Sequence, residues 1–115
     1  MIAPFFCRIS KTVSALVDNY SELEFDLAIA DYDRAIKLDQ NNSYFFSNRG
    51  NANMRKGQFD LAIADDDKAI ELYPLNYRAY NISGYSHFMK GDIDKAIADY
   101  ATVPDLKADR QPKRR

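Results

Sequence analysis

The sequence predicts an all-α protein in which antiparallel helical hairpins stack into an α-solenoid. Three segments align without gaps at one constant offset: 25–42, 59–76 and 93–110. Glycines follow the same period, because Gly50 recurs as Gly84, and Gly57 as Gly91, at that same offset. Within each unit, apolar residues recur at intervals of three, four and seven, which is the periodicity of an amphipathic helix. About three repeats are expected, with a degenerate first and a truncated last.

Length and composition fit one small folded domain, residues 1–115. Hydrophobic residues make up 46% and charged residues 29%, which is too apolar for a disordered chain. The net charge of -1 offers no overall attraction for a polyanion, although residues 105–115 carry five basic and two acidic side chains. The single cysteine, Cys7, excludes an internal disulfide and fits a reducing compartment.

Neither a leader nor a membrane span is expected. The first six residues are apolar, but no basic segment precedes them and Arg8 soon follows. No apolar run approaches the ~20 residues that a membrane-spanning helix needs. We therefore expect a soluble, cytoplasmic protein.

The first unit, about residues 9–42, departs from the period, because Leu16 and Leu23 stand in the positions of the two glycines. Its opening segment nevertheless carries apolar residues at helical spacing: Phe5, Phe6, Ile9, Val13, Leu16, Val17 and Tyr20. This stripe starts next to Pro4, a favoured first-turn residue, and predicts one long helix. Ser21 and Glu24 have the spacing of a capping box, which predicts that a second helix begins there.

The second and third units, 43–76 and 77–103, are predicted helical hairpins. The dipeptides Lys56-Gly57 and Lys90-Gly91 lie between their helices, where glycine can adopt the left-handed conformation that ends a helix. Pro104 is unfavourable inside a helix, so we expect the last helix to end near Thr102. Residues 104–115 are then a basic, flexible tail.

The repeat resembles the tetratricopeptide repeat, whose 34-residue unit is a helix–turn–helix. The second unit supplies its signature as Phe46, Gly50, Ala62, Ala69 and Pro74, and the third as Tyr80, Gly84, Ala96 and Tyr100. The resemblance covers about residues 9–103 and implies a right-handed superhelix. Gly50 facing Ala62, and Gly84 facing Ala96, would let the paired helices approach closely.

Some residues depart from the family pattern: Arg49, Asn53, Asp66, Ser83 and His87. Arg49 and Asp66 are charges in usually apolar positions of one hairpin. Because a buried charge is costly unless it is paired, we expect Arg49 to reach Asp66 or another carboxylate. Consecutive helix residues diverge by about 100°, so we interpret the run 65–67 as a solvated face rather than a metal site.

Catalysis is not expected. His87 has no second His or Cys at ligand spacing and is interpreted as a packing residue. Cys7 has no neighbouring His or Cys-x-x-Cys partner that would make it a nucleophile. No phosphate loop, nucleophile elbow or metal motif occurs. We predict a protein that is not an enzyme and has neither cofactor nor metal.

The resemblance implies that the first helix of each hairpin lines a concave groove that binds a peptide or protein segment. Carried over position by position, the exposed groove residues are Tyr44, Ser47, Asn48, Asn51, Arg55, Arg78, Asn81, Tyr85, Phe88 and Met89. A non-catalytic interaction module or scaffold with a protein or peptide partner is the leading hypothesis. A nucleic-acid-binding helical repeat is the alternative, which the acidic body disfavours. Self-assembly through open repeat ends is a third hypothesis, because Ile97 and Tyr100 should remain partly uncovered.

One subclass of the family clamps the terminal carboxylate of chaperones with five polar residues on the first helices. Mapped here, Asn48 and Arg78 match, but Val13, Val17 and Ile82 occupy the other positions. We therefore predict no tight recognition of a chaperone's acidic C-terminal tail.

Overall fold

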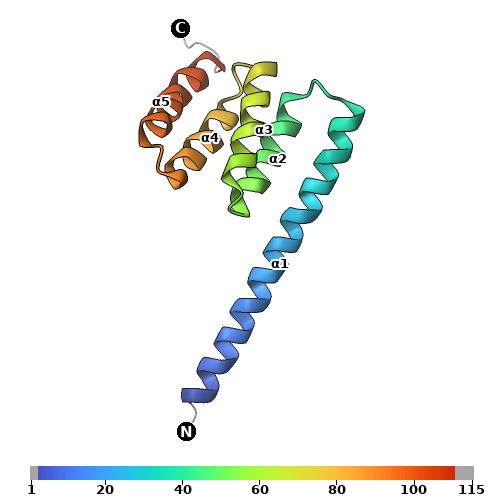
Figure 1. Ribbon diagram of the computed structural model, residues 1–115, viewed down its shortest axis with the longest axis vertical. Coiled ribbons are helices and arrows are strands. Elements are labelled where there is room, and N and C mark those ends of the chain that lie inside the picture. The colour runs from blue at the N-terminus through green and yellow to red at the C-terminus, as the bar shows by residue number, and fades with distance from the viewer. Residues whose placement is uncertain (1–2, 111–115) are drawn as a thin grey trace.

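The computed structural model describes residues 3–110, with side chains described for residues 21–104. Five helices and no strand make up this part of the chain: α1 (Ala3–Leu38), α2 (Ser43–Arg55), α3 (Phe59–Leu72), α4 (Tyr77–Lys90) and α5 (Ile93–Arg110). α2 pairs with α3 and α4 with α5, while α1 packs on α2 (Figure 1). The predicted all-α stack of hairpins is confirmed.

Both hairpins turn at the predicted glycines. Gly57 has φ 81° and Gly91 has φ 89°, a left-handed conformation that other residues rarely adopt. After α4, the Gly91 amide donates to the Phe88 carbonyl at 3.0 Å, and the Asp92 amide donates to the His87 carbonyl at 2.8 Å. These bonds satisfy carbonyls at the end of the helix and let α5 return alongside it.

The first unit is not a hairpin. α1 is one continuous helix of 36 residues, so the prediction that a capping box at Ser21 and Glu24 opens a new helix is wrong. Leu23, in the position of the turn glycines, is a strong helix former and disfavours a left-handed turn. The first half of α1 therefore runs straight on, away from the two hairpins (Figure 1).

The last helix is longer than predicted. α5 continues to Arg110 with Pro104 inside it, so the expected end near Thr102 is wrong and residues 104–110 are not a tail. Proline fixes φ at a helical value, so α5 can continue through Pro104 although the proline has no N–H to donate to the carbonyl of residue 100. The rest of the predicted tail, 111–115, lies outside the described residues. Ile97 and Tyr100 are exposed, as expected for an uncovered last hairpin.

The two hairpins are joined by a small core and a buried amide. Phe46, Ala69 and Ala79 form the core, which brings α2, α3 and α4 together. Asn76 is fully buried; its Nδ2 donates to Ser43 Oγ at 2.8 Å, and its Oδ1 accepts from the Ala79 amide at 3.3 Å. The Asn76 side chain thus caps α4 and fixes its start to the start of α2.

Close helix approach occurs at both helical glycines. A Cβ at Gly50 would meet Asp66 Oδ1 first, at 2.7 Å, and then the Ala62 carbonyl oxygen at 3.2 Å, so Ala62 faces Gly50 as predicted but Asp66 is closer still. A Cβ at Gly84 would meet the Tyr100 ring at 3.2 Å, and the nearest atoms are not those of Ala96. In the last hairpin the glycine therefore makes room for an aromatic ring.

Candidate functional site

A groove lies where α2 and α4, the first helices of the two hairpins, run beside each other. Its first hollow has a volume of about 270 Å³ and is lined by Asn51, Met54, Arg78, Asn81, Ile82, Tyr85 and Tyr100. α2, α4 and α5 all contribute to it. The lining combines two amides, one guanidinium and several apolar or aromatic side chains.

A second hollow of about 410 Å³ borders the first, because Met54 and Tyr85 line both. Its lining is completed by Phe25, Arg55, Gly57 and Phe59. The rings of Phe59 and Tyr85 lie 6.4 Å apart, and the Arg55 guanidinium lies 5.3 Å from the centre of the Phe25 ring. We call the two hollows together the α2–α4 groove; it runs from α5 across α2 and α4 to α1.

Five of the ten predicted binding residues line this groove: Asn51, Arg55, Arg78, Asn81 and Tyr85. Six lining residues were not predicted from the sequence: Phe25, Met54, Gly57, Phe59, Ile82 and Tyr100. The repeat period could have predicted one of them, Met54. Met54 stands one period before Phe88, which was predicted to face the groove.

Ser47 does not belong to the exposed side, contrary to prediction. It is fully buried; its Oγ donates to the Tyr44 carbonyl at 3.2 Å and accepts from Asn76 Nδ2 at 3.3 Å. The loop before α4 covers this position and is held there by the Asn76 amide, which donates to Ser43 and Ser47. Ser47 therefore cannot contact a peptide without displacing that loop.

The remaining predicted residues lie away from both hollows. Tyr44 lies near the start of α2, with its ring 6.2 Å from that of Tyr73 in a separate depression. Phe88 and Met89 are exposed near the end of α4, and Asn48 is half-buried on α2. None of these four side chains lines the α2–α4 groove.

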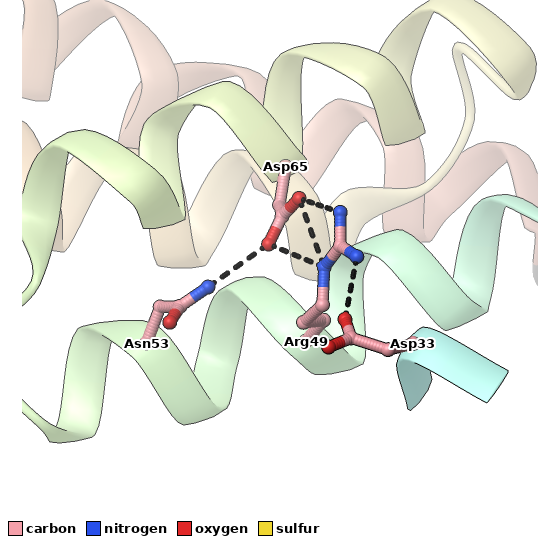
Figure 2. A network of polar contacts seen from close by, with 4 residues as sticks. All are labelled: Asp33, Arg49, Asn53 and Asp65. Carbon is pink, nitrogen blue, oxygen red and sulfur yellow. Dashed lines mark hydrogen bonds and ion pairs between the residues drawn. The ribbon is translucent and has the colours of Figure 1, made fainter. Parts of the chain in front are cut away.

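A polar network fixes α2 between α1 and α3 (Figure 2). Arg49 Nη2 donates to Asp65 Oδ1 at 2.7 Å, and Arg49 Nη1 donates to Asp33 Oδ1 at 2.8 Å. Asn53 Nδ2 donates to Asp65 Oδ2 at 3.0 Å. The hydrogen bond to Asp65, more than any other contact, raises the pKa of Arg49. The prediction that Arg49 reaches a carboxylate is confirmed, with Asp65 and Asp33 as its partners rather than Asp66.

Asp66 lies behind this network, against Gly50. Its side chain is fully buried, and neither carboxylate oxygen has a hydrogen-bond partner. Burial away from water, followed by repulsion from Asp65, raises the pKa of Asp66 from 3.8 to about 9. The interpretation of residues 65–67 as a solvated face is wrong for Asp65 and Asp66; Asp67 alone of the three is exposed.

His87 lies between two carboxylates of the last hairpin. The His87 side chain is largely buried, with Nδ1 3.7 Å from Asp92 Oδ2 and Nε2 4.0 Å from Asp99 Oδ2. Its packing role agrees with the sequence interpretation. The side chain of Cys7 lies outside the described set. Among side chains 21–104, no group of three His, Cys, Asp or Glu residues is placed to hold a metal ion.

Two protein-family models match the chain. A family model described as TPR repeat matches residues 20–57, and one described as tetratricopeptide repeat matches residues 48–110, more than half of the chain. The chain belongs to the tetratricopeptide repeat family. This family is in general a non-catalytic, protein-interaction fold. No curated protein matches the chain.

Solved tetratricopeptide repeat structures resemble the chain over most of its length. The second such domain of human RPAP3, in complex with the HSP70 peptide SGPTIEEVD, is 27% identical with a TM-score of 0.71, covering 77% of this chain and 74% of that one. The domain TPR2B of yeast Sti1, in its pHsp70 complex, is 25% identical with a TM-score of 0.74, covering 81% and 74%. The Arabidopsis OM64 domain is 26% identical with a TM-score of 0.73, covering 80% and 76%.

The described helices contain no stretch that is long and apolar enough to cross a membrane.

Proposed function

We propose that this tetratricopeptide repeat protein is a non-catalytic interaction module that binds a peptide segment in the α2–α4 groove. The single observation that carries the proposal is the groove itself, where Asn51, Arg78 and Asn81 converge beside Met54 and Tyr85. Amides can donate to and accept from an extended peptide backbone, and a guanidinium pairs with a carboxylate. The similar domains of Sti1 and RPAP3 were solved with chaperone-derived peptides, which supports this use of the fold.

The lining chemistry suggests what the peptide contains. Arg78 at one hollow and Arg55 at the other attract acidic side chains or a terminal carboxylate. Met54 and Tyr85 line both hollows and, together with Phe59, offer contacts for one bulky apolar side chain. We infer an extended segment with an apolar anchor flanked by acidic groups.

The chaperone-tail mode of the similar domains does not carry over. Ile82 is buried where the clamp needs a basic residue. Residues 13 and 17 belong to the half of α1 that runs away from the hairpins (Figure 1). Only Asn48 and Arg78 remain of the clamp residues, and Asn48 lies outside the groove.

The single cysteine of the chain supports a reducing, cytoplasmic setting for the module.

The proposal can be tested without knowing the natural partner. Peptides selected from a random display library on the whole chain are added to labelled protein, and amide shift changes are mapped by NMR. We expect the largest changes at Asn51, Asn81 and Tyr85. Changes confined to the outer side of α3, around Asp67 and Glu71, would overturn the proposal. So would a failure of selection combined with RNA binding that weakens steeply with salt.

A further inference from the structure

The second half of α1 lacks the helix that covers its equivalents in the other units. Ala62 in α3 and Ala96 in α5 are 0% and 2% exposed, whereas Ala28, one period before Ala62, stays partly exposed. The Asp65 side chain is 9% exposed, but that of Asp31, its equivalent in α1, is 72% exposed. Residues 21–38 thus present an open face in the position where a hairpin partner packs.

The partner helix of this unit exists in the chain but cannot reach that face. Residues 3–20 precede residues 37–54 by one period, so they are the first-helix segment of the unit. Because α1 is straight, positions 19 and 31 lie about 18 Å apart along one helix axis. Folding back would need a turn at Leu23, where Gly57 and Gly91 adopt positive φ in the other units.

The sequence of residues 3–20 nevertheless retains features of a hairpin partner. Asn19 occupies the position of Asn53, whose Nδ2 donates to Asp65 at 3.0 Å, and Asp31 occupies the position of Asp65. Apolar residues recur along this segment at helical spacing. Leu23 and Leu27, near the junction of the two halves, are 57% and 65% exposed.

We propose that two copies of the chain pair through α1, so that residues 3–20 of each copy cover the open face of residues 21–38 of the other. The first hairpin then forms between copies, which is a domain swap with an open hinge at Leu23. The opposite net charges of the two halves of α1 favour an antiparallel arrangement, in which residues 3–20 of one copy lie against residues 21–38 of the other. Residues 3–20 carry two basic and one acidic side chain, whereas residues 21–38 carry five acidic and two basic ones.

The swap also lengthens the binding surface. α2 packs beside α4 as well as against α3. By the same period, the partner's residues 3–20 would lie beside α2, next to the hollow that Phe25 and Arg55 line. The groove of each copy is therefore completed by the other copy. The pairing itself does not depend on peptide binding, and its tests below use no peptide.

Cross-linking between differently tagged chains tests the pairing directly. In a Cys7→Ser background, a chain with Leu16→Cys is mixed with a chain carrying Ala28→Cys, because these positions correspond to Gly50 and Ala62, which face each other in the second unit. Asp18→Cys, two residues on and on the opposite side of the helix, is the matched control. We expect mixed disulfide dimers with position 16 and few with position 18. Equal cross-linking at the two positions, or none, overturns the proposal.

Restoring the hinge tests the mechanism. Glu22→Lys combined with Leu23→Gly recreates the Lys-Gly turn of the other units. In sedimentation at tens of micromolar, the unaltered chain and Leu23→Ala should be dimers, and the Lys-Gly variant should be a monomer with similar helix content. A monomeric unaltered chain, or a Lys-Gly variant that stays dimeric, contradicts the swap.

Discussion

Arg49 and Asp65 face each other across the α2–α3 hairpin, with Arg49 Nη2 2.7 Å from Asp65 Oδ1 and Arg49 Nε 3.1 Å from Asp65 Oδ2. The planar guanidinium thus meets the carboxylate with two nitrogens. Its third nitrogen reaches Asp33 on α1 (Figure 2). One side chain therefore ties together the three helices α1, α2 and α3, and it sets the position of α2 as a wall of the groove.

Arg49→Ala should lower the free energy of unfolding by about 2 to 3 kcal/mol, because it leaves Asp65 largely buried without its cation. Urea unfolding followed by circular dichroism measures the change. Arg34→Ala is the control, because Arg34 forms an exposed pair with Asp31 and should cost no more than about 0.5 kcal/mol. Equal effects of the two variants would show that the buried pair has no special role.

Asp66→Leu should stabilise the fold by about 1 to 3 kcal/mol, because it replaces a fully buried carboxyl group without partners by an apolar side chain of similar shape. The same urea experiment measures the gain. Asp67→Leu, next to it but exposed, serves as the control and should change stability little. A loss of stability in Asp66→Leu would mean that the carboxyl group has a favourable interaction in the fold.

The contribution of Asp66 to stability should fall as pH rises between about 4 and 9. Burial raises the pKa of Asp66 from 3.8 to about 9, so the folded state holds a proton that the unfolded state has released in this range. The stabilising contribution is fully present below pH 3.8 and is lost progressively toward pH 9. Asp66→Asn, which does not titrate, should lose less stability than the unaltered chain between pH 5 and pH 8 in urea unfolding. Parallel pH profiles of the two proteins would contradict this account.

A peptide ending in EEVD with a free carboxylate should not bind with micromolar affinity. Most of the clamp positions are apolar here, and Ile82 is buried at one of them. Isothermal titration with the free-acid peptide and its C-terminal amide checks this. Micromolar binding that disappears on amidation would show that other groups of the chain replace the clamp.

The sequence period was sufficient to place the two complete hairpins, because glycine at positions 57 and 91 permits the positive φ that their turns require. It failed at Ser21 and Glu24, since a capping box acts only where a preceding turn breaks the helix, and Leu16 and Leu23 favour continuation. Pro104 led to the opposite error: the helix was expected to end near Thr102, but α5 continues through the proline, whose fixed φ is a helical value.

Burial was the harder quantity to predict from the sequence. Asp31, Asp65 and Asp99 occupy the same position of the period, yet only Asp65 is buried, because α3 packs between α2 and α4. Ser47 was misplaced for a related reason, since its cover comes from the loop that holds Asn76. Five of the eleven groove-lining residues followed from the first-helix positions. Phe25, Phe59 and Tyr100 come from second helices, which the resemblance does not assign to the groove.

The central claim is that the α2–α4 groove binds peptide, and fluorescence anisotropy with a library-selected peptide tests it most directly. Tyr85→Ala and Asn81→Ala remove an aromatic contact and an amide from the groove wall, while Glu71→Ala alters an exposed residue of α3 and is the matched control. Thermal melts establish that the three variants remain folded. We predict that each groove variant weakens binding roughly tenfold or more while Glu71→Ala leaves the affinity unchanged. Unchanged affinity in folded Tyr85→Ala and Asn81→Ala would contradict the account.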